Sequence, residues 1–487
     1  MMLPRAVIAA VIISGSPLCA AGPESFVRPV PAGGPANTTL VVYDTLAKPF
    51  SLANEVSVVT TLLGRFQTRV DARQAAAVTV PDVARADYIV LIGVAGAPQL
   101  TDPVRDALGK SNKPVFALGW ASVPRGEVSS VRPQSLADAR VAYRGAEWRA
   151  DLDPFFGARA VTGQSMAVVT SPAPRRALAW REGGNFFFAS LPSAGGASLI
   201  LSDVLLDFYG VENLPSPALV YLVQDFHPGC DAQSFRRLAD YFAARGDRFA
   251  VSVRLKSPLP SAAAMPEEEF FDALRYAQTR GGRVVLRPEV NATQVRSLLD
   301  AGLVPFACEL PSAGNRPARV LPGISYGTAL GKIEAPGPKG TVQPVTASSV
   351  MAGDESTLVI PLNIDPALAS TARRGIAAEV EELARLRGTV AGVVVPAWFP
   401  FQKMRDAVDD ARRAGVPGAD LAIAPNWIKT ERAIITGKNV RRGFSLPGGT
   451  ATERVSFDGN LRRVAQEDSL PQGEVAMATA ILLHQER

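Results

Sequence analysis

Histidine is almost absent from this sequence, whose 487 residues contain only His227 and His484. A catalytic metal site with three histidine ligands is therefore excluded. Cysteine is nearly as scarce, and Cys19, Cys230 and Cys308 do not have the spacing of a metal-binding pair. We therefore expect neither a metal site nor a cofactor.

Long apolar runs and blocks of like charge are also missing. After residue 21 no stretch approaches ~20 consecutive apolar residues, so no membrane span is expected in the mature chain. The formal net charge of +5 is small for this length, and no Lys/Arg run of the kind that follows a phosphate backbone occurs. These features argue against a nucleic-acid partner. Hydrophobic residues make up 47% and charged residues 20%, which is typical of globular domains.

The first 21 residues resemble a signal peptide. Arg5 supplies a positive charge, residues 6–13 are apolar, and small residues follow around Ala20 and Ala21. A buried core helix is the alternative. We expect cleavage after Ala20 or Ala21 and an exported protein, periplasmic or extracellular. In an oxidising compartment Cys230 and Cys308 could form a disulfide, and two buried free thiols are the alternative.

Alternating strand and helix patterns predict a first α/β domain, sandwich-like, over residues 38–214, after a Pro/Gly-rich linker at 22–37. The alternating pattern in the first half of this domain predicts a largely parallel sheet, and residues 141–192 are rich in strand patterns. A helix is expected at 197–209. Pro215 and Pro217 then mark the boundary to the second domain.

The second domain, residues 215–440, predicts seven strands separated by helices. This pattern is typical of a β/α barrel of the TIM type, complete or incomplete. Residues 311–356, rich in Pro, Gly and Ser, are expected to form an inserted loop, and 441–487 a C-terminal extension. The expected strands are 218–225, 248–253, 283–286, 304–308, 357–363, 391–395 and 421–424.

A Gly-Ile-Ser-Tyr-Gly sequence at 323–327 matches the nucleophile elbow of serine hydrolases. The strand before it and the helix after it, which the strained elbow requires, are not predicted. A serine hydrolase is therefore not favoured.

Polar and aromatic side chains follow the expected barrel strands, where TIM-type barrels carry their functional residues. Carboxylates, amides and indoles are the groups that bind sugar hydroxyls and stack on sugar faces. The alternative is that they cap helices or satisfy loop backbone groups. The residues are Gln224, Asp225, His227, Arg254, Arg287, Glu289, Glu309, Asn363, Asp365, Trp398, Asn426 and Trp427.

The second domain resembles the polysaccharide deacetylase superfamily, in a bacterial branch that carries an N-terminal α/β domain. The resemblance covers about residues 218–430. It rests on Val-Tyr-Leu-Val-Gln-Asp at 220–225, Phe-Asp-Ala-Leu-Arg-Tyr-Ala-Gln at 271–278, Gly-Gly-Arg-Val-Val-Leu-Arg-Pro-Glu-Val-Asn at 281–291, and the strand and helix at 393–415.

The resemblance implies a metal-dependent site that this sequence does not keep. In that superfamily the first strand ends in two aspartates, a general base and a metal ligand, and two histidines four residues apart complete the site. Here Gln224 stands at the base position and Asp225 at the ligand position, while Arg287 and Asn291 replace the histidines. An amide cannot serve as the base, and a guanidinium repels a metal ion. We hypothesise that Arg287 instead pairs with Asp225.

The main hypothesis is an exported carbohydrate-binding or polysaccharide-assembly protein without metal-dependent deacetylase activity, a pseudoenzyme. Its partners would be a polysaccharide or envelope glycan and an envelope protein. The expected substrate-binding residues are Gln224, His227, Arg254, Arg287, Asn291, Asn363, Trp398 and Trp427.

Two alternatives remain open. One is a metal-independent glycoside hydrolase, or an atypical deacetylase, whose catalytic candidates are Asp225, Glu289, Glu309 and Asp365. A hydrolase requires two carboxyl groups about 5–5.5 Å apart for retention or about 6.5–9.5 Å apart for inversion, and it fails if arginines neutralise them. The other is a purely structural partner in an envelope complex.

Overall fold

The computed structural model describes residues 37–43, 53–66, 68–93, 100–119, 133–157, 163–172, 175–191, 194–212, 214–256, 264–310, 324–336, 342–351, 357–367, 374–419, 421, 424, 427–430, 434–438, 441–445 and 452–456. The expected signal peptide lies outside these residues, and so does the linker apart from Asn37. Asn426 and His484 also lie outside them. None of the helices in the described ranges is long and apolar enough to cross a membrane.

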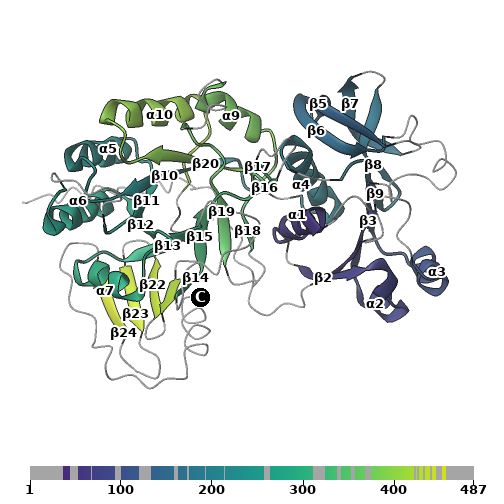
Figure 1. Ribbon diagram of the computed structural model, residues 1–487, viewed down its shortest axis with the longest axis horizontal. Helices are drawn as coiled ribbons and strands as arrows, with labels where there is room; N and C mark the ends of the chain where they lie inside the picture. Colours follow the sequence, from purple (N-terminus) through teal and green to yellow (C-terminus); the bar gives the residue numbers. More distant parts are fainter. Residues whose placement is uncertain are drawn as a thin grey trace, which may run out of the picture.

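The first domain is built on a nine-stranded mixed sheet (Figure 1). Strands β2, β1, β3, β4 and β9 are parallel neighbours, and β9, β8, β7, β5 and β6 are antiparallel neighbours. The parallel sheet expected for the first half of the domain is present in strands β1 to β4, and the strand-rich second half forms mostly antiparallel pairs. In sheet order the strands are β2 (Thr68–Gln74), β1 (Asn37–Tyr43), β3 (Tyr88–Gly93), β4 (Val115–Gly119), β9 (Asn185–Phe188), β8 (Arg176–Glu182), β7 (Gln164–Ser171), β5 (Gln134–Tyr143) and β6 (Ala146–Phe155).

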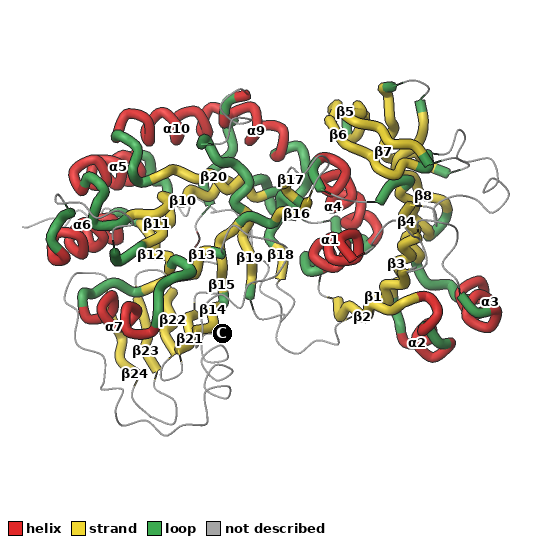
Figure 2. Tube along the Cα trace, viewed as in Figure 1, coloured by secondary structure: helices red, strands yellow, loops and turns green. Residues whose placement is uncertain are grey.

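Helices cover both faces of the parallel half. Helices α1 (Ala53–Leu63) and α4 (Gly196–Phe208) pack on the face that contributes Val41 and Val90 to the large core. A short 3₁₀ helix (Ala75–Ala77) with α2 (Val80–Arg85) and α3 (Asp102–Lys110) covers the opposite face. Successive residues of a strand point to opposite faces, so the near-continuous apolar β1 serves both layers. Figure 2 shows α1 and α4 between this sheet and the second domain.

The second domain contains a nearly closed, barrel-like sheet of seven parallel strands, with the short antiparallel β18 at one edge. An isolated parallel bridge between Ile364 and Val393 connects the two ends of the sheet. The strands are β10 (Ala218–Phe226), β11 (Phe249–Val253), β12 (Gly282–Leu286), β13 (Pro305–Glu309), β15 (Thr328–Gly331), β18 (Val350–Met351), β19 (Leu358–Pro361) and β20 (Val390–Pro396).

One of the seven parallel strands is not the one that the sequence predicts. Strand β15 lies inside the segment 311–356 that we expected to be a loop. Leu421 and Ala424, the ends of the expected strand 421–424, belong to no strand, although both are buried in the barrel interior. Strand β15 is four residues long and is flanked by Gly327, which explains why its pattern is weak.

Successive side chains of β10 point alternately into the barrel interior and toward the outer layer of helices. Ala218, Val220 and Leu222 belong to the interior cluster, whereas Tyr221 and Val223 belong to the core shared with the surrounding helices. Asp231 caps α5, as its position predicts, by accepting the backbone N–H groups of the next turn. The described helices of this domain are α5 (Ala232–Ala244), α6 (Glu267–Thr279), α7 (Ala292–Asp300), α9 (Ile376–Leu383) and α10 (Phe401–Arg413).

Asn363 closes the barrel between β19 and β20. Its Oδ1 accepts the N–H of Gly392 at 2.9 Å, and its Nδ2 donates to the carbonyl of Val390 at 3.2 Å. A side chain at Gly392 would place Cβ 2.0 Å from the carbonyl oxygen of Pro361, so only glycine fits here. The Asn363 amide is therefore engaged in barrel closure.

Two smaller antiparallel sheets accompany the barrel. Ser325 lies within strand β14, which pairs antiparallel with β21, so the 323–327 sequence does not sit in a strand–elbow–helix unit. The small sheets comprise β14 (Ile324–Tyr326), β21 (Trp427–Thr430), β22 (Ile434–Lys438), β23 (Arg441–Ser445) and β24 (Thr452–Ser456), and separately β16 (Glu334–Pro336) and β17 (Val342–Pro344).

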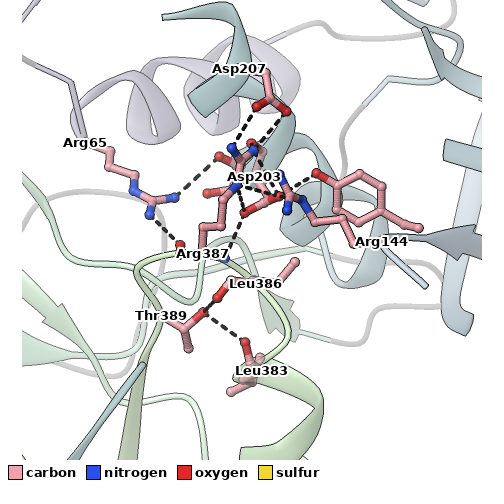
Figure 3. Close-up of polar contacts among 10 residues, drawn as sticks. Arg65, Arg144, Asp203, Asp207, Leu383, Leu386, Arg387 and Thr389 are labelled. Atoms are coloured by element: carbon pink, nitrogen blue, oxygen red, sulfur yellow. Dashed lines mark hydrogen bonds and ion pairs between the residues drawn. The ribbon is translucent and has the colours of Figure 1, made fainter. Parts of the chain in front are cut away.

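An ion-pair cluster centred on the buried Asp203 joins the two domains (Figure 3). Arg387, in the turn before β20, donates from Nη1 and Nη2 to the two carboxylate oxygens of Asp207 at 2.7 and 2.9 Å. Its Nε lies 3.1 Å from Asp203, whose side chain is only 1% exposed and which also accepts the backbone N–H of Arg387. Both aspartates belong to α4, so one side chain of the barrel domain holds the last turns of the first domain's helix.

Further groups complete this cluster on the first-domain side. Tyr143 donates to Asp203 at 2.5 Å, and Arg144 lies 2.9 Å from the same carboxylate. Arg65 donates to the carbonyl of Arg387 at 2.6 Å, and burial lowers the pKa of Arg65 to about 10. Buried charges are tolerated only with such complete pairing.

Replacing Arg387 with Ala leaves Asp207 without this partner and the buried Asp203 with fewer partners. We expect Arg387→Ala to lower the free energy of unfolding by about 3 kcal/mol, the cost of breaking a buried ion pair. Arg385→Ala, a matched change at an exposed neighbour, should have little effect. Urea denaturation of both variants tests this, and equal midpoints would contradict it.

Candidate functional site

The inward-facing polar residues at the carboxyl ends of β10 to β13 meet at one end of the barrel, which we call the barrel mouth. Gln224 continues the inward alternation of β10, and the register with β11 then shifts between Val223 and Phe226. Within this bulge Asp225 has a φ of 61°, and its N–H donates to Ser252 Oγ at 2.8 Å. Left-handed backbone at a non-glycine residue is uncommon outside special sites.

Two arginines and two carboxylates alternate across the barrel mouth. Arg254 Nε lies 2.8 Å from Asp225 Oδ1 and 3.2 Å from Glu289 Oε1. Arg287 Nε lies 3.7 Å from the same Asp225 oxygen and 3.2 Å from the same Glu289 oxygen. The hypothesised contact between Arg287 and Asp225 is therefore within ion-pair distance. The shorter pair is with Arg254, a role that the sequence analysis did not assign.

Glu309 forms the floor of the barrel mouth. Its side chain is 5% exposed, accepts from Gln224 Nε2 at 2.5 Å and lies 3.5 Å from Arg287 Nη1. Burial raises the pKa of the Glu309 carboxyl, against the opposing effects of Arg287 and Gln224. Gln224 thus supports a buried acid here and has no proton-accepting role.

His227 lies beside this group and is largely buried. Its Nδ1 accepts the N–H of Gly229 at 3.0 Å, which assigns the proton of the neutral ring to Nε2. Burial lowers the pKa of His227 from its ordinary value, with Asp225 opposing and Arg254 and Arg287 reinforcing this shift. The imidazole is therefore neutral at pH 7.

The two cysteines of the barrel domain are buried free thiols, so of the two alternatives the disulfide is not formed. Burial raises the pKa of Cys230 to about 11 and also raises that of Cys308. Neither thiol is a reactive thiolate near pH 7.

A second charged pair lies at the ends of β15 and β19. Lys332 Nζ lies 3.1 Å from Asp365 Oδ2, and Asp365 Oδ1 accepts the N–H of Ala367. Burial raises the pKa of neighbouring Glu334, and Lys332 opposes this rise. Asp365 therefore pairs with Lys332, which directly follows β15, a strand that was not predicted from the sequence.

The remaining expected site residues take no part in the ion pairs described above. Asn291 caps α7, where its side chain accepts the N–H of Gln294, and Asn363 closes the barrel. Trp398 is 51% exposed and follows β20. Trp427 lies in β21, and its side chain is outside the described structure.

The donor set does not fit a divalent metal of the kind that the resemblance implies. Two guanidinium groups already flank the carboxylate of Asp225, and the Asn291 amide is used in the helix cap. Within the described ranges no three His, Cys, Asp or Glu side chains gather into a potential metal site. Metal binding here would have to displace both arginines.

Ser252, Lys332 and Glu334 were missed by the sequence analysis. Ser252 follows interior Ala250 by two residues, so strict alternation along β11 would have found it. Lys332 and Glu334 could not be found without recognising β15.

Comparisons with known proteins add no family assignment. No protein-family model and no curated protein matches the chain. Among solved structures, a putative ThuA-like protein from Bacteroides uniformis aligns with 37% of this chain and 91% of its own length, at 11% identity and a TM-score of 0.25. A likeness this low supports no conclusion about family or function.

Because the pKa of Glu309 is raised, the stability of the protein should depend on pH in a specific way. A carboxyl with a raised pKa binds more protons in the folded than in the unfolded state, so its contribution to stability falls as pH rises above its ordinary value of 4.5. Glu309→Gln removes this contribution. We therefore expect the stability of Glu309→Gln relative to the parent protein to increase between pH 4.5 and pH 7, because the folded parent protein must ionise a buried carboxyl over this range.

Urea denaturation at several pH values measures this difference. Glu268→Gln, at an exposed position on α6, is the control and should not show this increase. A flat difference for Glu309→Gln would show that its pKa is not raised by folding.

Proposed function

We propose that this chain is an exported carbohydrate-binding or polysaccharide-assembly protein. In this proposal the barrel is of the polysaccharide deacetylase kind, and its mouth binds a glycan without metal-dependent deacetylation. The partners are a polysaccharide or envelope glycan and an envelope protein.

The observation that carries the proposal is the exposed indole of Trp398, which follows β20 at the same end of the barrel as the polar groups of the mouth. Gln224 is the register partner of Pro396, and the N–H of Ala397 donates to the Gln224 carbonyl at 2.9 Å. Trp398 thus follows directly the residue that joins β20 to the end of β10. Among the described residues only Val80 and Trp398 are exposed large hydrophobic side chains. An aromatic face next to hydrogen-bonding groups suits a sugar ring.

The charge pairing supports the loss of deacetylase chemistry. That chemistry needs a carboxylate base and a metal that activates water. Gln224 occupies the base position and donates to Glu309, while Asp225 is held by Arg254 and Arg287. The residues at the base position and at the metal-ligand position are therefore each engaged by other side chains of the barrel mouth.

The same pairing disfavours a glycoside hydrolase, whose carboxyl groups must be available to a sugar. Asp225 and Glu289 share two arginines, Glu309 is buried against Gln224 and Arg287, and Asp365 pairs with Lys332.

Truncating the exposed indole tests the proposal. We expect Trp398→Ala to weaken glycan binding about tenfold or more, because stacking on an aromatic face is lost. Isothermal titration calorimetry against a panel of bacterial envelope polysaccharides would measure this. Binding should be unchanged in EDTA.

Val80→Ala is the matched control, since Val80 is the other exposed large hydrophobic residue and lies on α2. It should leave glycan affinity unchanged. Failure of the parent protein to bind any envelope glycan, or equal affinities for the parent and Trp398→Ala, would refute the proposal.

A further inference from the structure

The two arginines of the barrel mouth are held by carboxylates that differ in exposure. Asp225 is 15% exposed, and its backbone is fixed within the β10 bulge. Glu289 is 44% exposed and lies in the turn between β12 and α7, where the N–H of Val290 donates to the Arg287 carbonyl. The Glu289 side chain can therefore turn into water without a change in the strands.

The ion pairs of Glu289 are the weaker ones. Exposed ion pairs contribute little net stability because water and salt screen them, whereas partly buried pairs are screened less. When Glu289 leaves, Arg287 keeps Glu309 and Asp225, and Arg254 keeps Asp225. The two guanidinium groups then remain in place with one anionic partner missing.

We propose that Arg254 and Arg287 form a binding site for the carboxylate of an acidic sugar, and that Glu289 occupies this site until the ligand displaces it. The inference rests on the proposed function and names the class of glycan, one that contains uronic acid. Glu289 shows that a carboxylate oxygen fits between the two guanidinium groups, because its Oε1 lies 3.2 Å from both Nε atoms. Guanidinium groups are suited to carboxylates by charge and by their planar donors.

A neutral glycan gains nothing from this exchange. A hydroxyl that displaced Glu289 would leave two cations with a poorer partner, since charge-assisted hydrogen bonds are the stronger ones. The site should therefore discriminate between a uronate and its methyl ester, which differ in charge and little in shape.

The test compares polygalacturonate, alginate and hyaluronan fragments, each with its methyl ester, by calorimetry. The full chain, Glu289→Gln, Glu268→Gln and Arg254→Gln are compared. We expect Glu289→Gln to bind at least one of the acids about tenfold more tightly than the parent protein, because the internal competitor is removed, with no gain for its ester. Glu268→Gln, the same charge change at an exposed site on α6, should show no such gain. Arg254→Gln should lose the preference for the acid, and 0.5 M NaCl should reduce it.

Equal affinities for acid and ester in both the parent protein and Glu289→Gln would overturn this inference. If the protein then still binds neutral envelope glycans through Trp398, the proposed function survives without it. If it binds no glycan of either kind, both fail. Because Glu289 is exposed, Glu289→Gln should melt at the parent temperature, which shows whether a negative result reflects misfolding.

Discussion

The pairing of Asp225 with Arg254 determines what the barrel mouth can do. A carboxylate that is largely removed from water requires a cation, and here a guanidinium supplies the charge. The β10 bulge presents Asp225 to the neighbouring strands, Arg254 follows β11 and Arg287 follows β12. Closure of the barrel brings these consecutive strand ends together, so each ion pair depends on the parallel order of the sheet.

The two charged clusters of the protein differ in a way that matters for function. Between the domains, Asp203 is almost fully buried and its oxygens are taken by Arg387, Arg144 and Tyr143. In that cluster the Asp203 carboxylate is fully engaged, and the ion pairs hold α4 against the barrel. At the barrel mouth, Glu289 is exposed and held only by arginines that have other partners. An arrangement of this second kind can exchange one anion for another, whereas the first cannot without separating the domains.

Much of the fold could be predicted from the sequence, because long apolar strands and amphipathic helices have clear periods. The strand at 218–225 and the Asp231 cap are examples. Strand β15 could not be predicted, since four residues that follow Gly327 and end with Gly331 have no measurable period and only pairing with β13 and β19 defines the strand. The antiparallel half of the first sheet was likewise visible only as strand-rich sequence.

The structure brings several of the predicted strand-end residues together at the barrel mouth. The predicted contact of Arg287 with Asp225 is within ion-pair distance, whereas the shorter pair of Asp225 with Arg254 was not predicted. Strand-end position identified Asp225, Arg254, Arg287, Glu289 and Glu309, because it depends only on where apolar runs stop. The same rule selected Asn363 and Asn291, whose amides serve the barrel closure and a helix cap. Whether a polar residue faces a ligand or a backbone group depends on three-dimensional contacts.

Glycan binding without metal-dependent deacetylation is tested most directly by incubating the purified protein with acetylated glycans, with and without zinc. The experiment measures glycan retention and acetate release together. We predict that glycan is retained and no acetate is released, and zinc-dependent acetate release would contradict this prediction.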